Sequence, residues 1–261
     1  VAKNIKLFKP EMILMVPLMI ETMAKKLEEA SLLPAKIVKS QVFGKQFHTI
    51  CSGGAYLDPK YIDLFKKYDI VIQQGYGMTE CAPVISVNQS WNIRSDSVGQ
   101  LLPNCEAKTV DGELWVKGSS VMQGYYKMPE ETAETLEDGW LKTGDLGYVD
   151  EDGFVYLTGR KKNLIITKNG ENVSPEELEN ALSTNRLVGE ILVREKDGVI
   201  EAEIYPDQDY VKKKRIKDVR EKLQEIIDEY NKTAAPQKRI YSLIVRDKEF
   251  EKTTTRKIKR F

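Results

Sequence analysis

The 261-residue sequence predicts a chain of mixed α/β and α+β class that is built from three parts. Residues 1–95 alternate apolar strand segments with helical segments and glycine-rich loops, which is typical of an open α/β sheet. Residues 96–158 carry short strand segments separated by Asp-Gly pairs, which predicts a small β-barrel-like subdomain. Residues 159–261 mix strand and helical segments, so we expect an α+β domain there.

Two helices are predicted in the first part. Residues 17–30 place apolar side chains at helical spacing and carry a charged outer face. Asp58 is a favoured N-cap residue, and Pro59 is a favoured first helical residue. A second helix is therefore expected to begin there and to end near Lys67.

Two predicted strands flank the second helix, and each runs into a loop that contains glycine. The strand at residues 49–51 enters a tight loop at residues 52–55. The buried strand at residues 70–72 enters the loop at residues 73–77. Because ligands of open α/β sheets bind at the carboxyl ends of strands, both loops are candidate binding segments.

Asp-Gly pairs mark the turns of the middle part. Asp111-Gly112, Asp138-Gly139 and Asp152-Gly153 are hairpin signals, since both residue types tolerate the positive φ that tight hairpin turns require. The segments beside them predict strands at residues 113–116, 140–141, 147–149 and 154–157.

The last part begins with a hairpin that turns at Gly170. Ser174 with Glu177 three residues later predicts a capping box, and the helix that it starts is expected to reach Leu182. Residues 210–230 predict one long, charged amphipathic helix. Strands are predicted at residues 188–193, 199–204 and 241–245.

Composition argues against several classes of protein. Forty Lys and Arg balance forty Asp and Glu, so no net field draws the chain to nucleic acid. His48 is the single histidine and lies in a predicted strand, which gives poor support to a Ser-His-Asp hydrolase or a His-rich metal site. Cys51, Cys81 and Cys105 show no paired spacing, so we expect reduced thiols in or near the core of a cytoplasmic protein.

The segment Gly75-Tyr76-Gly77-Met78-Thr79-Glu80 carries the strongest local chemical signal. Its glycines let the backbone approach a ligand, and Tyr76 offers an aromatic face to a flat base. Thr79 offers a hydroxyl to a phosphate, and Glu80 offers a carboxylate to Mg²⁺, which is usually bound by few carboxylates together with phosphate oxygens. Alone, the pattern favours an ordinary tight turn whose glutamate is solvated.

Further motifs follow it in a fixed order. With them, essentially the whole sequence resembles the adenylate-forming superfamily of acyl- and aryl-CoA synthetases, luciferases and peptide-synthetase adenylation domains. The basic tail and the lysine at position 162 make it most similar to bacterial long-chain-fatty-acid–CoA ligases. The resemblance is carried by Ser52-Gly53-Gly54-Ala55, Gly75 to Glu80, Val98-Gly99, Gly118 to Tyr126, Gly139 to Asp145, Gly159 to Ile165, Gly170 to Glu179 and Thr253 to Ile258.

The resemblance implies a fold for each part and a set of ligands. Residues 1–95 would be the end of a large α/β domain, residues 96–158 its β-barrel-like subdomain, and residues 159–261 a mobile lid domain. The implied ligands are ATP, AMP and Mg²⁺, with CoA as cosubstrate. The loop of Gly53, Gly54 and Ala55 would flank the adenine and the acyl pocket.

In the first two parts, the resemblance implies four further contacts with the nucleotide. Tyr76, which stands between Gly75 and Gly77, would stack on the adenine. Thr79 would contact the α-phosphate, and Glu80 would bind Mg²⁺. Asp145 would accept both ribose hydroxyls.

In the last part, the resemblance implies residues that act through domain rotation. Arg160 would be a second ribose or phosphate contact, and Lys162 would be the hinge. Gly170 would begin a loop that lines the pantetheine tunnel. Lys257 would bridge the carboxylate and the α-phosphate during adenylation, although Arg256 stands before it where glycine is common.

The implied activity is ATP-dependent activation of a long-chain fatty acid as acyl-AMP, followed by transfer to CoA. Medium-chain or aryl substrates, a phosphopantetheine carrier protein as the acceptor, and a non-catalytic nucleotide-binding module stay open as alternatives. We expect no nucleic-acid partner. Lipid substrates leave peripheral membrane contact open, and the sequence does not indicate the oligomeric state.

The sequence also departs from the family at its beginning. The Ser/Thr/Gly-rich phosphate loop that ends in lysine does not occur in these residues, and the first residue is Val1. The β- and γ-phosphates would then lack their backbone cradle. We therefore expect a fragment of a longer enzyme that is inactive by itself.

Overall fold

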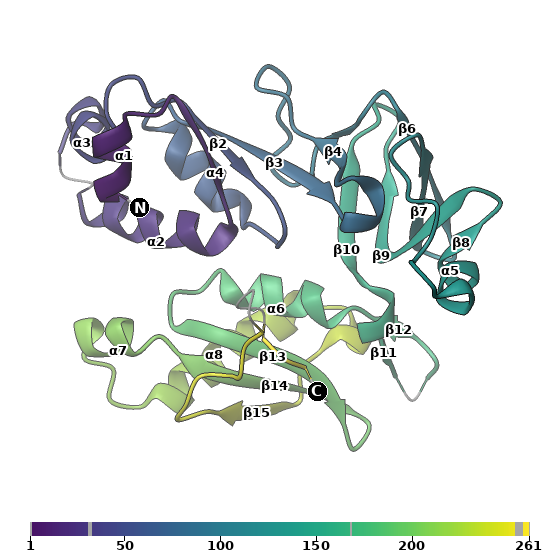
Figure 1. Cartoon of the computed structure of the whole chain (residues 1–261). Coiled ribbons are helices and arrows are strands. Elements are labelled where there is room, and N and C mark those ends of the chain that lie inside the picture. The colour runs from purple at the N-terminus through teal and green to yellow at the C-terminus, as the bar shows by residue number, and fades with distance from the viewer. Residues whose placement is uncertain (1, 31–32, 168, 254–257, 261) are drawn as a thin grey trace. The chain divides into compact units, whose positions relative to one another are not determined.

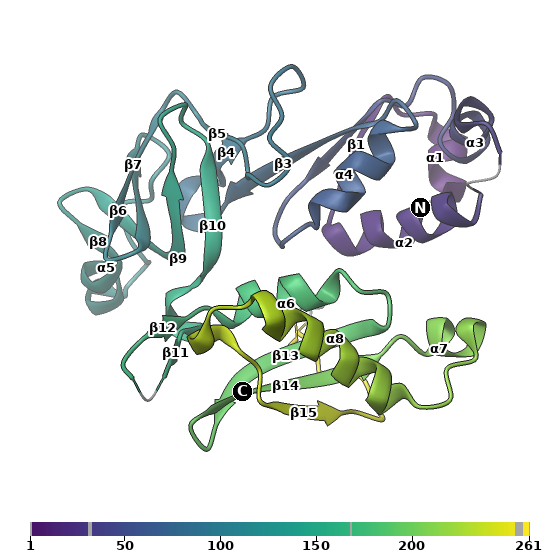
Figure 2. The same cartoon turned by 180° about the vertical axis from the view of Figure 1, so that it is seen from behind.

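The computed structural model describes residues 2–30, 33–167, 169–253 and 258–260. The chain folds into two compact units, Val1–Leu157 and Thr158–Phe261 (Figures 1 and 2). The predicted mixed α/β and α+β class is confirmed, because the first unit holds a mixed sheet and a curled sheet and the second holds a small sheet with helices. The predicted boundaries of three parts stay a prediction.

A five-stranded mixed sheet forms the first half of the first unit. Its strand order is β1-β2-β3-β4-β5, with β1, β2 and β3 parallel and β4 and β5 antiparallel to their neighbours. These strands are β1 Met12–Met15, β2 Thr49–Ser52, β3 Val71–Gly77, β4 Val84–Val87 and β5 Gln100–Leu101.

Strand β3 is longer than the sequence predicts. The prediction of a loop at residues 73–77 is wrong, because these residues continue the strand. Residues 71–74 pair with β2, and residues 75–77 pair with β4. Glycine here serves close strand packing rather than a turn, since a Cβ at Gly75 would lie 3.2 Å from the carbonyl oxygen of Ser86.

Four helices pack around the parallel strands of this sheet (Figure 1). They bury a core that includes Phe43, Phe47 and Phe65. Asp58 caps α4 as predicted, because its carboxylate accepts a hydrogen bond of 2.9 Å from the amide of Lys60. The helices are α1 Ala2–Phe8, α2 Pro17–Glu29, α3 Ala35–Val42 and α4 Pro59–Lys66.

A curled antiparallel sheet forms the second half of the first unit, with strand order β10-β9-β7-β6 and β8 paired to β9. Two predicted hairpins are confirmed: Asp111-Gly112 and Asp138-Gly139 both have φ values near 49° and 80°. Asp152-Gly153 lies in the connection from β9 to β10, where Gly153 has φ 80°. The elements are β6 Cys105–Val110, β7 Glu113–Gly118, α5 Pro129–Thr135, β8 Leu136–Glu137, β9 Trp140–Val149 and β10 Val155–Arg160.

The second unit places helices α6 and α8 on one face of the sheet β13-β14-β15 (Figure 2). Alternation along β14 directs Ile200, Ala202 and Ile204 to this core and the carboxylates of Glu201 and Glu203 to the other face. The elements are β11 Ile165–Ile166, β12 Asn172–Val173, α6 Pro175–Ser183, β13 Val188–Lys196, β14 Val199–Pro206, α7 Gln208–Lys214, α8 Val219–Thr233 and β15 Ser242–Val245.

Two predictions about the helices of this unit are wrong. The single helix at residues 210–230 is two helices, because Arg215 adopts left-handed backbone with φ 53° and Asp218 caps α8 through the amide of Glu221 at 2.8 Å. Helix α6 begins where expected, but no capping box forms. The hydroxyl of Ser174 donates instead to the carboxylate of Glu176, at 3.1 Å.

No helix in the described part of the chain is long and apolar enough to cross a membrane.

Candidate functional site

The carboxyl end of β2 lies beside a glycine of β3. Ser52 and Gln74 are register partners, and Gly53 and Gly75 follow them. A Cβ at Gly53 would lie 3.1 Å from the carbonyl oxygen of Gly75, so the two backbones pack closely. Gly54 has φ 84° with open space beside it, which glycine permits without strain. The loop therefore keeps its backbone accessible beside the end of β2.

The hydroxyl of Ser52 is a buried polar group at the same strand end. Its residue is 6% exposed, and the oxygen has no hydrogen-bond partner among the described residues. A buried hydroxyl without a partner costs roughly 1–3 kcal/mol, so such groups call for an explanation in a native protein. A polar ligand group at this strand end would satisfy it.

Tyr76 and Asp145 come together from positions 69 residues apart. The phenol hydroxyl on β3 donates a hydrogen bond of 2.6 Å to Oδ2 of the carboxylate on β9. Both residues are nearly buried, with 8% and 5% of their surface exposed. The residue predicted to stack on adenine thus touches the residue predicted to bind ribose.

Asp145 lies in an irregular segment of β9, not in a hairpin turn. The pairing register of β7 with β9 shifts between Glu113 and Trp115, opposite the Thr143-Gly144-Asp145 segment. The Thr143 hydroxyl accepts from the amide of Asp145 at 3.1 Å, and the amide of Gly144 donates to the Glu113 carboxylate at 2.9 Å. Gly144 has φ 69°, which suits glycine. The bulge fixes where the Asp145 carboxylate points.

Thr79 and Glu80 lie in a short 3₁₀ helix, Thr79–Cys81, directly after β3. Oε1 of Glu80 accepts a hydrogen bond of 2.9 Å from the hydroxyl of Tyr125, and the Glu80 carbonyl accepts one of 2.8 Å from the amide of Met122. Burial, together with the neighbouring Glu80 carboxylate, raises the pKa of Tyr125. The hydrogen bond orients the carboxylate, and its Oε2 has no hydrogen-bond partner in the ranges that the structure describes.

Glu80 fits a magnesium ion as a single protein carboxylate. Mg²⁺ is usually held by one or two carboxylates, with phosphate oxygens and water completing six ligands. In the described ranges, no three His, Cys, Asp or Glu side chains gather into a metal-binding cluster. Thr79 is exposed beside Glu80, so its hydroxyl is available to a phosphate.

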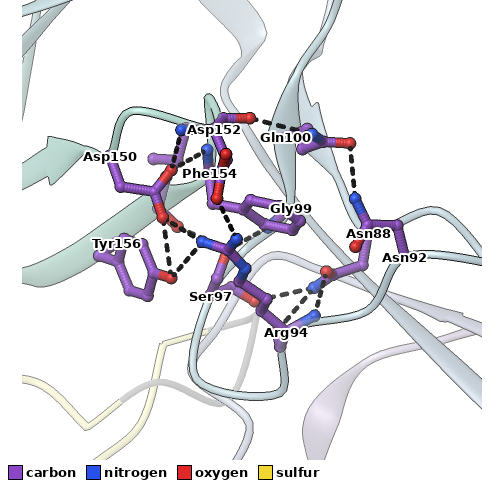
Figure 3. Close-up of polar contacts among 11 residues, drawn as sticks. Asn88, Asn92, Arg94, Ser97, Gly99, Gln100, Asp150, Asp152, Phe154 and Tyr156 are labelled. Carbon is purple, nitrogen blue, oxygen red and sulfur yellow. Dashed lines mark hydrogen bonds and ion pairs between the residues drawn. The ribbon is translucent and has the colours of Figure 1, made fainter.

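An ion-pair cluster fixes the loop between β4 and β5 (Figure 3). The guanidinium of Arg94 pairs with the carboxylates of Asp150 and Asp152 and lies 4.0 Å from the centre of the Phe154 ring. Asn88 closes the loop, since its side chain accepts from the amide of Arg94 at 3.0 Å. These contacts join the loop to the β9–β10 connection and stabilise the wall of the curled sheet.

Acid is expected to weaken this cluster. Burial acts to raise the pKa of Asp150, but hydrogen bonds from the Phe154 amide and the Tyr156 hydroxyl, with the charge of Arg94, outweigh it and lower the pKa. A depressed carboxyl pKa stabilises the fold above the ordinary pKa, and the contribution is lost as pH falls through the folded value. Urea unfolding at pH 7 and at acid pH should therefore show a smaller acid loss for Asp150→Asn than for the natural chain. Equal losses of unfolding free energy in the two proteins would contradict this role of Asp150.

The remaining predicted site residues belong to the second unit, which begins at Thr158 within β10. Arg160 is exposed at the end of β10, and Lys162 is exposed in the 3₁₀ helix Lys161–Asn163 that follows. Gly170 is exposed in the β11–β12 hairpin with φ 77°. Lys257, the predicted catalytic lysine, lies outside the described residues.

Two models of known families match most of the chain. The model of the AMP-binding enzyme matches residues 1–126, and the model of the AMP-binding enzyme C-terminal domain matches residues 162–261. The chain belongs to the AMP-binding enzyme family. Only residues 127–161 fall outside the two family matches.

Named relatives of this AMP-binding enzyme differ in substrate. A long-chain-fatty-acid–CoA ligase of Salmonella typhimurium is 44% identical over 130 residues, which are 45% of this chain and 23% of that protein. The 4-coumarate–CoA ligase-like 4 of rice is 43% identical over 165 residues, 57% of this chain and 30% of that protein. The match thus spans less than a third of either relative.

A solved structure supports the predicted fold. The o-succinylbenzoate CoA synthetase MenE of Bacillus subtilis, in complex with the acyl-adenylate intermediate OSB-AMP, has a TM-score of 0.78 and 27% identity. It covers 98% of this chain, and the chain spans about half of its length (51%).

Sequence reasoning missed three contributors to the candidate site of this AMP-binding enzyme. Tyr125 lies within a motif of the family resemblance, but no local pattern links it to Glu80, which is 45 residues away. Glu113 has no signal beyond a strand position, yet it holds the Gly144 amide. The unpartnered hydroxyl of Ser52 becomes apparent only once burial is known.

Proposed function

We propose that the chain forms the nucleotide-binding part of an ATP-dependent acyl-CoA ligase, an acid–thiol ligase that makes acyl-AMP from a carboxylic acid and ATP. The observation that carries the proposal is the Tyr76–Asp145 hydrogen bond. It joins an aromatic ring and a carboxylate from two separate motifs, at the edge where β2 ends beside a glycine of β3. The Ser52 hydroxyl adds an unsatisfied donor at that edge. AMP-binding enzyme membership supports the same reading.

Each residue of the first unit has a proposed role. The ring of Tyr76 stacks on adenine, and the Asp145 carboxylate accepts the ribose hydroxyls. The Thr79 hydroxyl donates to the α-phosphate, and Glu80 holds Mg²⁺, which would neutralise charge on the phosphoryl oxygens. The backbone of Gly53, Gly54 and Ala55 lines the adenine and acyl positions, while Gly75 and Gly77 let β3 approach the ligand.

The second unit supplies groups that act in turn. We propose that Arg160 contacts ribose or phosphate and that Lys162 is the hinge of a mobile unit. Gly170 lies in the loop assigned to the pantetheine of CoA. Lys257 would stabilise the negative charge that develops between the carboxylate and the α-phosphate, and it must leave before the thiol attacks.

The proposed acyl group is a long-chain fatty acid. The ligase of Salmonella typhimurium supports it, while the rice 4-coumarate–CoA ligase-like protein favours an aryl acid as the second candidate. Each buried methylene adds about 0.8 kcal/mol, so a long apolar pocket would discriminate chain length. Medium-chain acids are a further alternative, which ligands of graded acyl length test. A carrier protein instead of CoA is the alternative acceptor, which a comparison of the two acceptors tests.

Titration calorimetry with AMP, and with acyl-sulfamoyl adenosines of graded length, tests the proposal without requiring turnover. We expect AMP to bind and affinity to rise from acetyl to dodecanoyl. Tightest binding of the coumaroyl compound would favour the aryl candidate, and absence of AMP binding would contradict the nucleotide site. AMP release from ATP, fatty acid and CoA should stay at background for these residues alone, because they contain no glycine-rich phosphate loop ending in lysine.

Tyr125→Phe is expected to weaken magnesium-dependent binding of ATP by about three- to tenfold. The change removes the hydrogen bond that orients the Glu80 carboxylate and frees that carboxylate to rotate. The expected loss in affinity corresponds to about 0.7–1.4 kcal/mol. AMP binding without Mg²⁺ should not change. Tyr126→Phe is the matched control, because that side chain is 85% exposed. Equal effects of the two variants on magnesium dependence would contradict the role of Tyr125.

A further inference from the structure

Two cysteine thiols share one hydroxyl partner in the core of the curled sheet. Sγ of Cys81 lies 3.4 Å from Oγ of Ser120, and Sγ of Cys105 lies 3.7 Å from the same oxygen. Cys81 ends the 3₁₀ helix after β3, and Cys105 begins β6. Segments 24 positions apart in the sequence are thus brought to one point, so neither cysteine is an isolated thiol.

The surroundings give the two thiols different reactivity. Both belong to one apolar cluster, where Cys81 is fully buried and Cys105 keeps 8% exposure. Full burial shields Cys81 from direct attack by solvent oxidants. Cys105 is therefore the thiol that an oxidant reaches first.

Ser120 is arranged to assist a thiolate. The side-chain amide of Asn104 donates to Oγ of Ser120 at 3.2 Å, so the hydroxyl proton is free to point at a sulfur atom. A hydrogen bond donated to sulfur favours the thiolate, which is the nucleophile of thiol–disulfide chemistry.

We propose that Cys81 and Cys105 are a redox-active dithiol that closes to an intramolecular disulfide when a two-electron oxidant such as an azodicarboxamide or a peroxide reaches Cys105. The Cys105 thiolate adds to the N=N bond of an azodicarboxamide, or takes one oxygen of a peroxide as a sulfenic acid while the other oxygen leaves as water or an alcohol. The Cys81 thiolate then attacks that sulfur, forms the S–S bond and expels the reduced oxidant as a hydrazine or as water. Two thiol protons and two electrons leave the protein and are taken up by the oxidant.

Closure of the bond would act on the candidate site. Cys81 follows Glu80 directly, so a covalent link to β6 would pull on the turn that carries the proposed magnesium ligand. This consequence rests on the proposed function, whereas formation of the disulfide does not. Loss of magnesium-dependent ATP binding after oxidation, and its return with a reductant, would show that the disulfide affects the proposed magnesium site.

Mass spectrometry of the chain after treatment with diamide tests the proposal. We expect a loss of two hydrogen masses and a proteolytic peptide pair that joins Cys81 to Cys105, both reversed by dithiothreitol. Cys51→Ser should behave like the natural chain, while Cys81→Ala and Cys105→Ala should form no internal bond. Ser120→Ala should slow closure by about three- to tenfold, and Ser119→Ala, at the exposed neighbour, should not.

Three results would overturn the proposal. The first is three free thiols per denatured chain after oxidation, which would mean inert structural cysteines. The second is a bond that involves Cys51, within or between chains. The third is an equal closure rate for the Ser120 and Ser119 variants, which would show that the Ser120 hydroxyl does not assist closure. None of these readouts depends on nucleotide binding, so failure of the disulfide and failure of the proposed function are distinguishable.

Discussion

Replacing Gly77 with alanine is expected to destabilise the unit that contains it by about 2–4 kcal/mol. A Cβ at this position would lie 1.9 Å from the carbonyl oxygen of Pro83, so backbone must move to relieve the overlap. Gly77 pairs with Val84, and the amide of Met78 donates to the same Pro83 oxygen at 2.8 Å. The atoms that would move are those that hold the turn of Thr79 and Glu80, so the proposed site should loosen with the fold.

Urea unfolding followed by tryptophan fluorescence measures this loss. Trp91, Trp115 and Trp140 all lie in the first unit, so the signal does not report unfolding of the second. Gly75→Ala is the matched control on the same strand. Its Cβ would lie 3.2 Å from the Ser86 carbonyl oxygen, which a shift of a few tenths of an ångström relieves, at a cost of about 1 kcal/mol. Equal unfolding free energies for the two variants would show that the β3–β4 connection is not packed as described.

Asp145→Asn is expected to weaken AMP binding by about 30-fold. The amide keeps the shape of the side chain and can still accept from the Tyr76 hydroxyl, so the bulge of β9 should survive. It loses the negative charge that strengthens two hydrogen bonds from the ribose hydroxyls, by about 1 kcal/mol each. A loss of about 2 kcal/mol corresponds to the stated change in affinity.

Deoxynucleotides identify the contact. The natural chain should prefer AMP to 2′-deoxy-AMP, and Asp145→Asn should lose most of this preference. Asp138→Asn is the control, because that residue lies in the β8–β9 hairpin turn with φ 49°, where asparagine is equally favoured. If Asp145→Asn binds AMP as tightly as the natural chain does, Asp145 does not contact the ribose. The family assignment would not change.

Local chemistry explains which elements could be predicted from the sequence. The Asp-Gly pairs at positions 111 and 138 specify hairpin turns wherever they occur between strands, and Asp58 followed by Pro59 specifies a helix start. The errors also have local causes. Glycine is typical of turns, but Gly75 and Gly77 lie in a strand. Arg215 ends a helix, although no glycine or proline stands there to predict a helix end.

The sequence by itself determined the fold class, the family and the residue types available for nucleotide chemistry, because these depend on periodicity and on motifs of adjacent residues. Only the tertiary structure decided which of those residues meet. The bond from Tyr76 to Asp145 spans 69 positions, and Cys81 and Cys105 reach one hydroxyl from separate elements. No local pattern encodes such contacts, because β3 and β9 belong to different sheets, and the elements that carry these residues meet only in a shared core once the unit has folded.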